Sequence, residues 1–302
     1  MRPLVTAALA PLGVAGAAAV WGVGVERYLF TVRYHALRVL PKGAAPLRVL
    51  HLSDAHMAPW QHRKQQWIAG LADLEPDLIV NTGDNLGHRD GLTGLREAFA
   101  PFRGIPGLFV HGSNDFQEPS PRNPLRYFLG PSGNHPKHRH LDVEALDRHL
   151  GDDLGWRALD DTAVSLEVNG TRITAFGVND AHRKWDHPEL IPPVLSGLDA
   201  ADLTLGVMHA PYRRTLDEFV DLGADVLFAG HTHGGQVRVP FSRNALVANC
   251  DIPLDQARGL SDWAHGERRV PLNVSAGIGH SIYAPVRFGC RPEASLITLL
   301  PR

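Results

Sequence analysis

The sequence predicts a mixed α/β (α+β) fold in which β-sheets pack face to face and helices cover them. Short apolar runs bounded by polar or glycine-containing turns recur from residue 47 onward, as expected for buried strands, and helical patterns separate those of the first half. In the second half, Asn169-Gly170 joins two short alternating segments and indicates a hairpin. The chain has 302 residues, 44% of them hydrophobic, and a formal charge of -2. This composition indicates a folded globular protein and argues against a nucleic-acid partner.

The first feature along the chain is an uncharged apolar run at residues 3–25. A helix that rises ~1.5 Å per residue over this length could cross a hydrocarbon core of ~30 Å. We predict that residues 1–26 form a transmembrane-like membrane anchor, with a cleaved signal peptide or a soluble apolar helix as alternatives. More basic residues follow the run than precede it, which favours a cytoplasmic domain only weakly, so the side of the membrane stays open.

Residues 27–46 are predicted to be a linker, because Pro41, Gly43 and Pro46 interrupt any periodic element. The main folded domain is then expected at residues 47–302. The expected strands lie at residues 47–52, 77–81, 107–111, 163–168, 171–176, 203–208, 225–229, 236–239, 273–275 and 295–299, and the expected helices at 63–74, 92–99, 143–150 and 213–222. A long proline-rich segment, residues 119–140, is predicted to be a loop at the rim of a substrate site.

Side chains that can bind metals follow five of these strands. In extended backbone, residues i and i+2 project to the same side, so each of two pairs could aim two ligands at one point. Because open α/β sheets bind their ligands beyond the carboxyl ends of the strands, we expect these side chains to converge. The donors are oxygen and imidazole nitrogen, which suits Mn, Fe or Zn better than a structural zinc site. The candidates are Asp54, His56, Asp84, Ser113, Asn114, Asp115, His209, His231 and His233.

In their order along the chain, these segments resemble the sequence blocks of the calcineurin-like metallophosphoesterase superfamily. The segment Gly-His-Thr-His-Gly-Gly-Gln at residues 230–236 and the tail Arg-Phe-Gly-Cys-Arg-Pro-Glu at 287–293 are similar to the bacterial subgroup of the YkuE and YaeI phosphoesterases. That subgroup includes membrane-associated or exported members, some linked to lipid substrates. The resemblance spans roughly residues 47–300. It implies a four-layer αββα sandwich that holds two divalent metal ions at the strand ends.

The resemblance also implies a role for each ligand. Asp54, His56 and His233 would bind the first metal, Asp84 would bridge both metals, and His209 and His231 would bind the second. A metal-bridging hydroxide would then attack phosphorus in line, while both cations stabilise the charge that builds on the phosphoryl oxygens.

The third block departs from the family pattern Gly-Asn-His-Asp/Glu. Here Ser113 stands at the place of the ligand Asn and Asn114 at that of the His. Either Ser113 becomes the ligand, or a backbone shift brings the Asn114 amide oxygen onto the second metal; we favour Asn114, because an amide carbonyl is the better neutral donor. Asn114 and Asp115 are the catalytic candidates, with Asp115 expected to orient a neighbour. The missing His removes a general acid, for which His135, His138 or His140 could substitute.

We therefore predict a dinuclear-metal phosphoesterase that acts on a phosphomonoester or phosphodiester, with a lipid or cell-envelope headgroup as a candidate substrate. A nucleotide phosphodiesterase or pyrophosphatase with a soluble substrate is the alternative within enzymes. A catalytically weak metal-bound interaction module at the membrane is the alternative in another class, motivated by the missing His. The other histidines, including His182, are expected to be ordinary polar or surface residues, and Cys250 and Cys290 to be unpaired. The sequence leaves the natural substrate, the native metal and the oligomeric state open.

Overall fold

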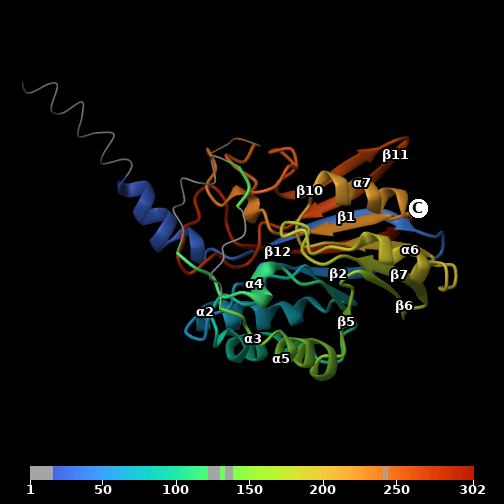
Figure 1. Cartoon of the computed structure of the whole chain (residues 1–302), viewed down its shortest axis with the longest axis horizontal. Coiled ribbons are helices and arrows are strands. Elements are labelled where there is room, and N and C mark those ends of the chain that lie inside the picture. The colour runs from blue at the N-terminus through green and yellow to red at the C-terminus, as the bar shows by residue number, and fades with distance from the viewer. Residues whose placement is uncertain (1–15, 122–129, 133–138, 241, 243) are drawn as a thin grey trace, which may run out of the picture.

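The structure is a computed structural model that describes residues 16–121, 130–132, 139–240, 242 and 244–302. Its centre consists of two six-stranded sheets (Figure 1). The first sheet has the order β1 (Thr31–Leu40), β12 (Glu293–Pro301), β2 (Leu47–Leu52), β3 (Leu78–Asn81), β4 (Gly107–Phe109) and β5 (Arg157–Ala158). The second has the order β10 (Gly259–His265), β11 (Arg268–Val274), β9 (Val226–Ala229), β8 (Leu203–Val207), β7 (Thr171–Gly177) and β6 (Thr162–Val168).

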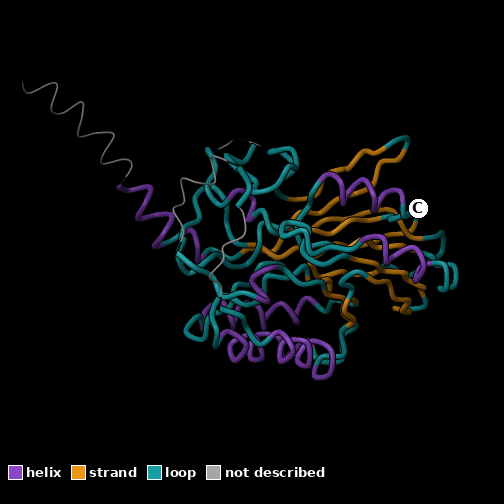
Figure 2. The backbone as a smooth tube through the Cα atoms, viewed as in Figure 1, coloured by secondary structure: helices purple, strands orange, loops and turns teal. Residues whose placement is uncertain are grey.

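Helices lie on the outer side of each sheet, as the tube view also shows (Figure 2). The first sheet is covered by α2 (His62–Ala69), α3 (Gly91–Phe99) and α5 (Val143–Asp147), and the second by α6 (Ile191–Leu195) and α7 (Arg213–Asp221). The one-turn helix α4 (Ser113–Phe116) follows β4. Short 3-10 segments are η1 (Glu26–Tyr28), η2 (Gly70–Leu74), η3 (Ala100–Phe102), η6 (Pro188–Leu190) and η7 (His233–Gly235), and η5 (Arg148–Asp153) is a π-helical turn.

The core forms three apolar layers, which is what two stacked sheets with outer helices require. Val49, Leu108 and Phe228 pack between the sheets, because successive side chains of a strand point to opposite faces. Leu50 of the same strand, β2, points outward and packs under the helices of the first sheet. Phe219 of α7 belongs to the layer outside the second sheet. This arrangement confirms the predicted mixed α/β fold with two packed sheets.

The predicted hairpin is present, whereas one predicted strand is not. β6 and β7 pair antiparallel, and the turn between them places Asn169 at φ 51° and Gly170 at φ 77°. At residues 236–239 the structure has only an isolated bridge between Val237 and Phe288, because Gln236 takes a φ of 55° that no strand allows. Strand β10 had no counterpart among the predicted strands.

The prediction that residues 27–46 are only a linker is wrong for Thr31–Leu40, which form β1 and pair in parallel with β12. The two prolines lie beyond the end of this strand, so they stop it rather than prevent it. Tyr34, Ala36 and Arg38 are exposed on one face, which is the alternation expected of an edge strand.

The predicted membrane-spanning segment falls largely on residues 1–15, outside the described part of the chain. Residues 16–24 are helical. Within the described ranges, no helix combines the length and apolar character needed to cross a membrane. The structure therefore gives no support to the membrane anchor predicted from the sequence.

Candidate functional site

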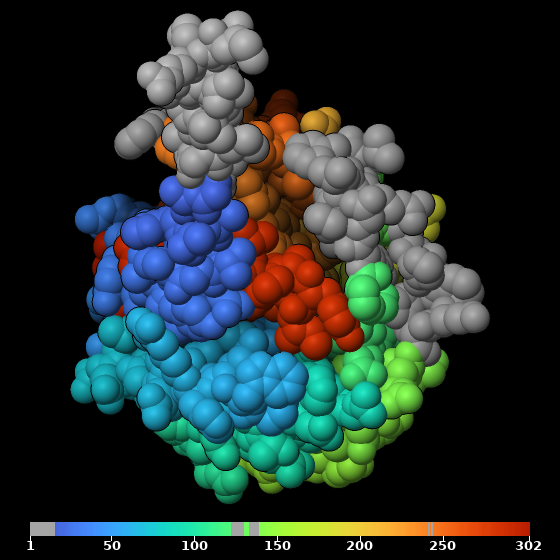
Figure 3. Space-filling view, turned by 90° about the vertical axis from the view of Figure 1, so that its left-hand side faces the viewer, coloured from blue at the N-terminus to red at the C-terminus, as the bar shows by residue number. Residues whose placement is uncertain are grey.

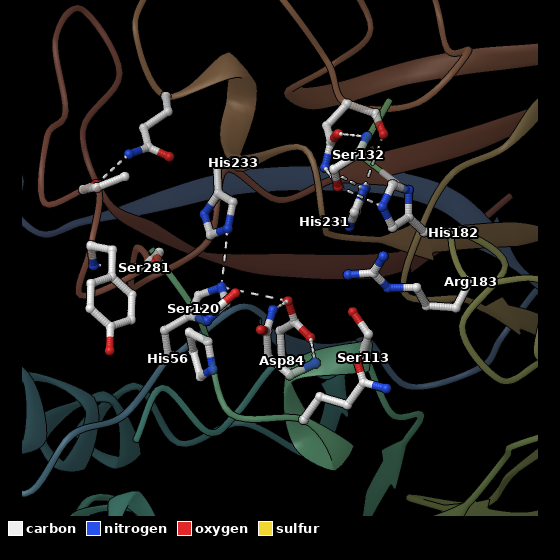
Figure 4. Close-up of a pocket in the computed structure, with 17 residues that line it drawn as sticks. His56, Asp84, Ser113, Ser120, Ser132, His182, Arg183, His231, His233 and Ser281 are labelled. Atoms are coloured by element: carbon white, nitrogen blue, oxygen red, sulfur yellow. Dashed lines mark hydrogen bonds and ion pairs between the residues drawn. The ribbon is translucent and has the colours of Figure 1, made fainter. Parts of the chain in front are cut away.

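The candidate site lies where the loops after β2, β3, β4, β8 and β9 meet. β2, β3 and β4 run parallel to one another in the first sheet, and β7, β8 and β9 do so in the second. Their carboxyl ends therefore reach the same edge of the molecule, where the close-up in Figure 4 shows polar side chains from both sheets around one pocket. The convergence expected from the sequence is present.

The backbone conformation at the donor residues differs from the predicted one. The extended conformation assumed for the two i, i+2 pairs is wrong, because each of the residues concerned has a positive φ. Such angles cost a non-glycine residue roughly 1–3 kcal/mol and persist where surrounding structure holds them, commonly at functional sites. The φ values are 49° at Asp54, 40° at His56, 65° at His231 and 49° at His233, with 53° at Asp84 as well.

Asp54, His56 and His233 form the first group of potential metal donors. His56 Nε2 lies 3.1 Å from His233 Nε2, so the two ring nitrogens face each other (Figure 4). Asp54 Oδ1 is 3.9 Å from His56 Nε2 and 3.6 Å from His233 Nε2. These are the three residues that the family resemblance assigns to one ion.

A second group contains Asp54, Asp84 and His209. Asp84 Oδ2 lies 3.5 Å from His209 Nε2 and 3.6 Å from His56 Nε2, so this oxygen stands between the two groups. Asp54 belongs to both groups, whereas the family resemblance implies that Asp84 is the shared residue. His231 adjoins the second group, with its Nδ1 3.3 Å from His209 Nε2.

Hydrogen bonds orient these side chains from behind. His209 Nδ1 is 2.7 Å from the Thr82 carbonyl oxygen, which can only accept, so Nδ1 carries a proton and Nε2 is the ring nitrogen that faces the site. Asp54 Oδ2 accepts from Ser53 Oγ at 2.5 Å and from the His231 backbone N–H at 3.0 Å. Groups held in this way keep the geometry that a metal ion requires.

The residues fit a metal, because the donor atoms that should face a cation have few other partners. Asp54 Oδ1 is fully buried and has no hydrogen-bond partner among the described residues, which is costly for a carboxylate unless a cation faces it. Burial outweighs the favourable charge of His209 and raises the pKa of Asp54 to about 6. Burial lowers the pKa of both His56 and His231 to about 4, so these rings are neutral and able to coordinate at pH 7.

Gly112 and Gly230 lie so close to the donor side chains that there is no space for a Cβ atom at either position. A Cβ atom on Gly112 would lie 2.2 Å from Asp84 Oδ1 and 2.7 Å from His209 Cε1. A Cβ on Gly230 would lie 2.0 Å from Ser53 Oγ and 2.6 Å from Asp54 Oδ2. Any larger residue at these positions would displace the donor groups.

In the third block, Asn114 and Ser113 both line the pocket. The Asn114 side-chain amide donates to Asp84 Oδ2 at 2.7 Å, while the Ser113 backbone N–H donates to Asp180 Oδ2 at 2.9 Å. Asp115 is fully buried and outside the pocket lining. It accepts from the backbone N–H groups of Asn85 at 2.7 Å and Gly112 at 3.1 Å, so it holds the loops after β3 and β4 together. In this placement Asp115 contacts the backbone of the two loops rather than the pocket.

Sequence reasoning missed His182 and Arg183, which lie on the turn after β7 and line the pocket (Figure 4). Asp180 anchors this turn, because its other oxygen accepts from the His182 backbone N–H at 2.8 Å. The His182 ring lies 4.3 Å from that of His231, centre to centre, and Arg183 extends into the pocket towards Asp84 and Ser113. No motif marks these residues, since their only sequence signal is a pair of basic residues in a polar turn.

The proposed substitute acids in the proline-rich loop are only partly placed. His135 and His138 lie outside the described residues. His140 is exposed, pairs with Gln117 in an isolated bridge and does not line the pocket.

Comparison with known proteins agrees with this geometry. Residues 47–235 match the calcineurin-like phosphoesterase family. The chain is 26% identical to protein YpbG of Bacillus subtilis over 264 residues, covering 85% of this chain and 83% of that protein. It is 26% identical to the phosphodiesterase YaeI of Escherichia coli over 274 residues (90% and 88%), and 22% identical to the metallophosphoesterase YkuE of B. subtilis over 294 residues (92% and 90%). The chain thus belongs to the calcineurin-like phosphoesterase family, within its bacterial YkuE and YaeI subgroup, and is a metal-dependent phosphoester hydrolase.

Proposed function

We propose that this protein hydrolyses a phosphodiester at a site for two divalent metal ions. The observation that carries the proposal is the pair of donor groups that share Asp54, whose buried Oδ1 accepts no hydrogen bond from the part of the chain that the structure describes. Two adjacent cations would supply Lewis-acid stabilisation of phosphoryl oxygens and lower the pKa of a bound water, which are the contributions that phosphoester hydrolysis needs.

The residues of this chain divide the work around those ions. Asp54, His56 and His233 would hold one ion, and Asp84, His209 and His231 the other. Asp54 belongs to both donor groups and would stand between the two ions. Mn, Fe and Zn all suit such mixed oxygen and nitrogen donors.

Arg183 lies across the pocket from His56 and His233 (Figure 4). A guanidinium there would donate to non-bridging phosphoryl oxygens, a strong charge-assisted contact. It would thereby orient the substrate and offset the negative charge of its phosphoryl group.

The proton needed by the leaving group has no evident donor in the third block. Asn114 cannot serve as a general acid, because an amide does not titrate near neutral pH. Esters whose leaving groups have a low pKa should therefore react faster than esters of simple alcohols. The name of the similar YaeI, a phosphodiesterase, supports the choice of a diester over a monoester.

The first experiment measures hydrolysis of bis(p-nitrophenyl) phosphate and p-nitrophenyl phosphate by the full chain with Mn, Fe, Zn or no added metal. His231→Ala is the test variant. His187→Ala is the matched control, because the His187 side chain is exposed and pairs with the equally exposed Glu189. We expect metal-dependent turnover that favours the diester, is lost in His231→Ala and is unchanged in His187→Ala. Metal binding without turnover of either ester would overturn the enzymatic proposal in favour of an interaction module.

The natural substrate is tested in two further arms. In one arm, the wild type is assayed with phospholipid vesicles, since a lipid or cell-envelope headgroup is one candidate. In the other, it is assayed with soluble dinucleotides and nucleoside diphosphates. We expect hydrolysis in one arm only, and that arm names the substrate class.

A further inference from the structure

Arg287 is the largest fully buried side chain in the described part of the protein, and its guanidinium contacts backbone carbonyls. Its Nη1 donates to the His233 carbonyl oxygen at 3.1 Å and to that of Ala276 at 2.7 Å. Its Nη2 donates to the carbonyl oxygens of Gly277, at 3.2 Å, and Gly279. One cation thus joins the motif around His233 to the loop after β11.

The contact with the His233 carbonyl bears directly on the first donor group. His233 holds a left-handed φ of 49°, a conformation that surrounding contacts must maintain. If that carbonyl turned away, the ring nitrogen that faces His56 Nε2 and Asp54 Oδ1 would move with it. Arg287 Nη2 also lies 3.2 Å from His233 Nδ1, so the guanidinium contacts both the ring and the backbone of His233.

The backbone around Arg287 is held in turn by the N-terminal segment. The Gly22 carbonyl oxygen accepts from the Arg287 backbone N–H at 3.1 Å. Glu26 is buried, and its Oε1 accepts from the Cys290 backbone N–H at 2.8 Å, while Oε2 accepts from Gly289 N–H at 3.0 Å and Trp21 Nε1 at 2.8 Å. In Figure 3 the blue N-terminal residues lie directly against the red C-terminal loops.

The contacts of Glu26 and the contacts of Arg287 are connected, because both involve the short segment 287–290. Cys290 links them a second time, because its Sγ lies 3.3 Å from the His233 carbonyl oxygen. A carboxylate that accepts backbone N–H groups fixes a loop firmly, since hydrogen bonds to a charged group are stronger than those between neutral groups.

We propose that the N-terminal segment Trp21–Glu26 is a positioning element of the metal site, which acts through Arg287 on His233. The inference rests on the proposed two-metal function. Glu26 holds residues 287–290, Arg287 holds the backbone of His233, and the first donor group keeps its shape as a result. A peptidase that cut within the Ala15-Gly16-Ala17 sequence would leave this element attached to the enzyme.

The test measures Mn²⁺ binding by equilibrium dialysis of the metal-stripped full chain, so its readout does not depend on turnover. The variants are Glu26→Gln, Arg287→Met and Arg287→Lys. Loss of a residue that orients a metal ligand weakens metal affinity about 10- to 100-fold, and we expect that range for Glu26→Gln and Arg287→Met. Arg287→Lys should recover part of the loss, because an ammonium can still donate to some of the carbonyls. At saturating Mn²⁺, kcat of Glu26→Gln should return towards the wild-type value.

Glu267→Gln and Arg269→Met are the matched controls, because both residues are exposed on the β10–β11 hairpin. Melting temperatures of the metal-free proteins show whether each variant folds. If Glu26→Gln does not fold, Trp21→Phe removes one donor to Glu26 and should give a smaller shift in the same direction.

Folded variants that bind Mn²⁺ as tightly as the controls would overturn the inference. A wild type that binds no Mn²⁺, Fe²⁺ or Zn²⁺ would instead overturn the proposed function, so the two failures are distinguishable.

Discussion

Asn114 holds both oxygens of Asp84. Its side-chain amide donates to Oδ2 at 2.7 Å and its backbone N–H donates to Oδ1 at 2.9 Å. Because Asp84 Oδ2 stands between the two donor groups, the residue that replaces the family's histidine still acts on the centre of the site. We therefore propose that Asn114 orients this carboxylate and does not transfer a proton.

This relationship predicts different effects for the two residues of the third block. Asn114→Ala should lower kcat/KM for the activated diester about 10- to 100-fold, the range found when a group that orients a metal ligand is removed. Ser113→Ala should leave it nearly unchanged, because the Ser113 contact to Asp180 is made by the backbone. Steady-state kinetics at saturating metal measures both. A larger loss in Ser113→Ala would identify Ser113 as the ligand.

Arg183→Gln should lower kcat/KM with little change in bound metal. A hydrogen bond to a charged group contributes about 1.5–3 kcal/mol, which corresponds to roughly 10- to 100-fold in rate. Lys184→Gln is the matched control, because it removes the same charge from an exposed neighbouring side chain. Parallel metal analysis and kinetics check the prediction, and equal kinetics in the two variants would exclude a role for Arg183 in substrate binding.

Metal binding should strengthen as pH rises from about 5.5 to 8. In the metal-free protein, burial raises the pKa of Asp54 to about 6, so this donor is protonated below that pH. Burial by itself lowers the pKa of His209, but the charge of Asp84 outweighs it and holds that pKa well above its usual range. A donor side chain must lose its proton before it can bind a metal ion. Protons on Asp54 and His209 therefore compete with the metal and weaken its binding at low pH.

Equilibrium dialysis with Mn²⁺ at several pH values, with proton release recorded in weak buffer, measures this dependence. His209→Gln should bind metal more weakly and release fewer protons. An affinity independent of pH over this range would contradict the prediction.

Gly112→Ala should abolish metal binding while the protein stays folded. The added Cβ would meet Asp84 Oδ1 at 2.2 Å, and the carboxylate would have to leave its position. Gly70→Ala is the matched control, because no described atom lies within 4 Å of the corresponding Cβ and φ there is -65°. Metal content and circular dichroism check the pair. Normal metal content in Gly112→Ala would show that the donor groups can adjust.

Much of the fold and of the donor set could be predicted because the signals are local. β2 lies at the predicted residues, and the Asn169-Gly170 hairpin forms as expected, since apolar alternation and turn chemistry act over a few residues. Asp54, His56 and Asp84 directly follow apolar strands in the sequence. Because this pattern is also local, it predicted that the three side chains lie at one edge of the sheet.

Other features depend on partners far away in the chain. β1 is a strand because β12, at the opposite end of the sequence, supplies its hydrogen bonds. His56 faces His233 across 177 residues of sequence, and Glu26 holds Gly289 across 263.

The sequence by itself therefore determined which residues offer metal-binding side chains and which strands these residues follow. Only the tertiary structure decided which donor is shared, that Arg183 enters the pocket, and that the N-terminal segment holds the loop behind His233. The physical reason is that side-chain chemistry and local periodicity reside in neighbouring residues, whereas the positions of the donor atoms depend on left-handed turns and buried hydrogen bonds that form when both sheets pack together.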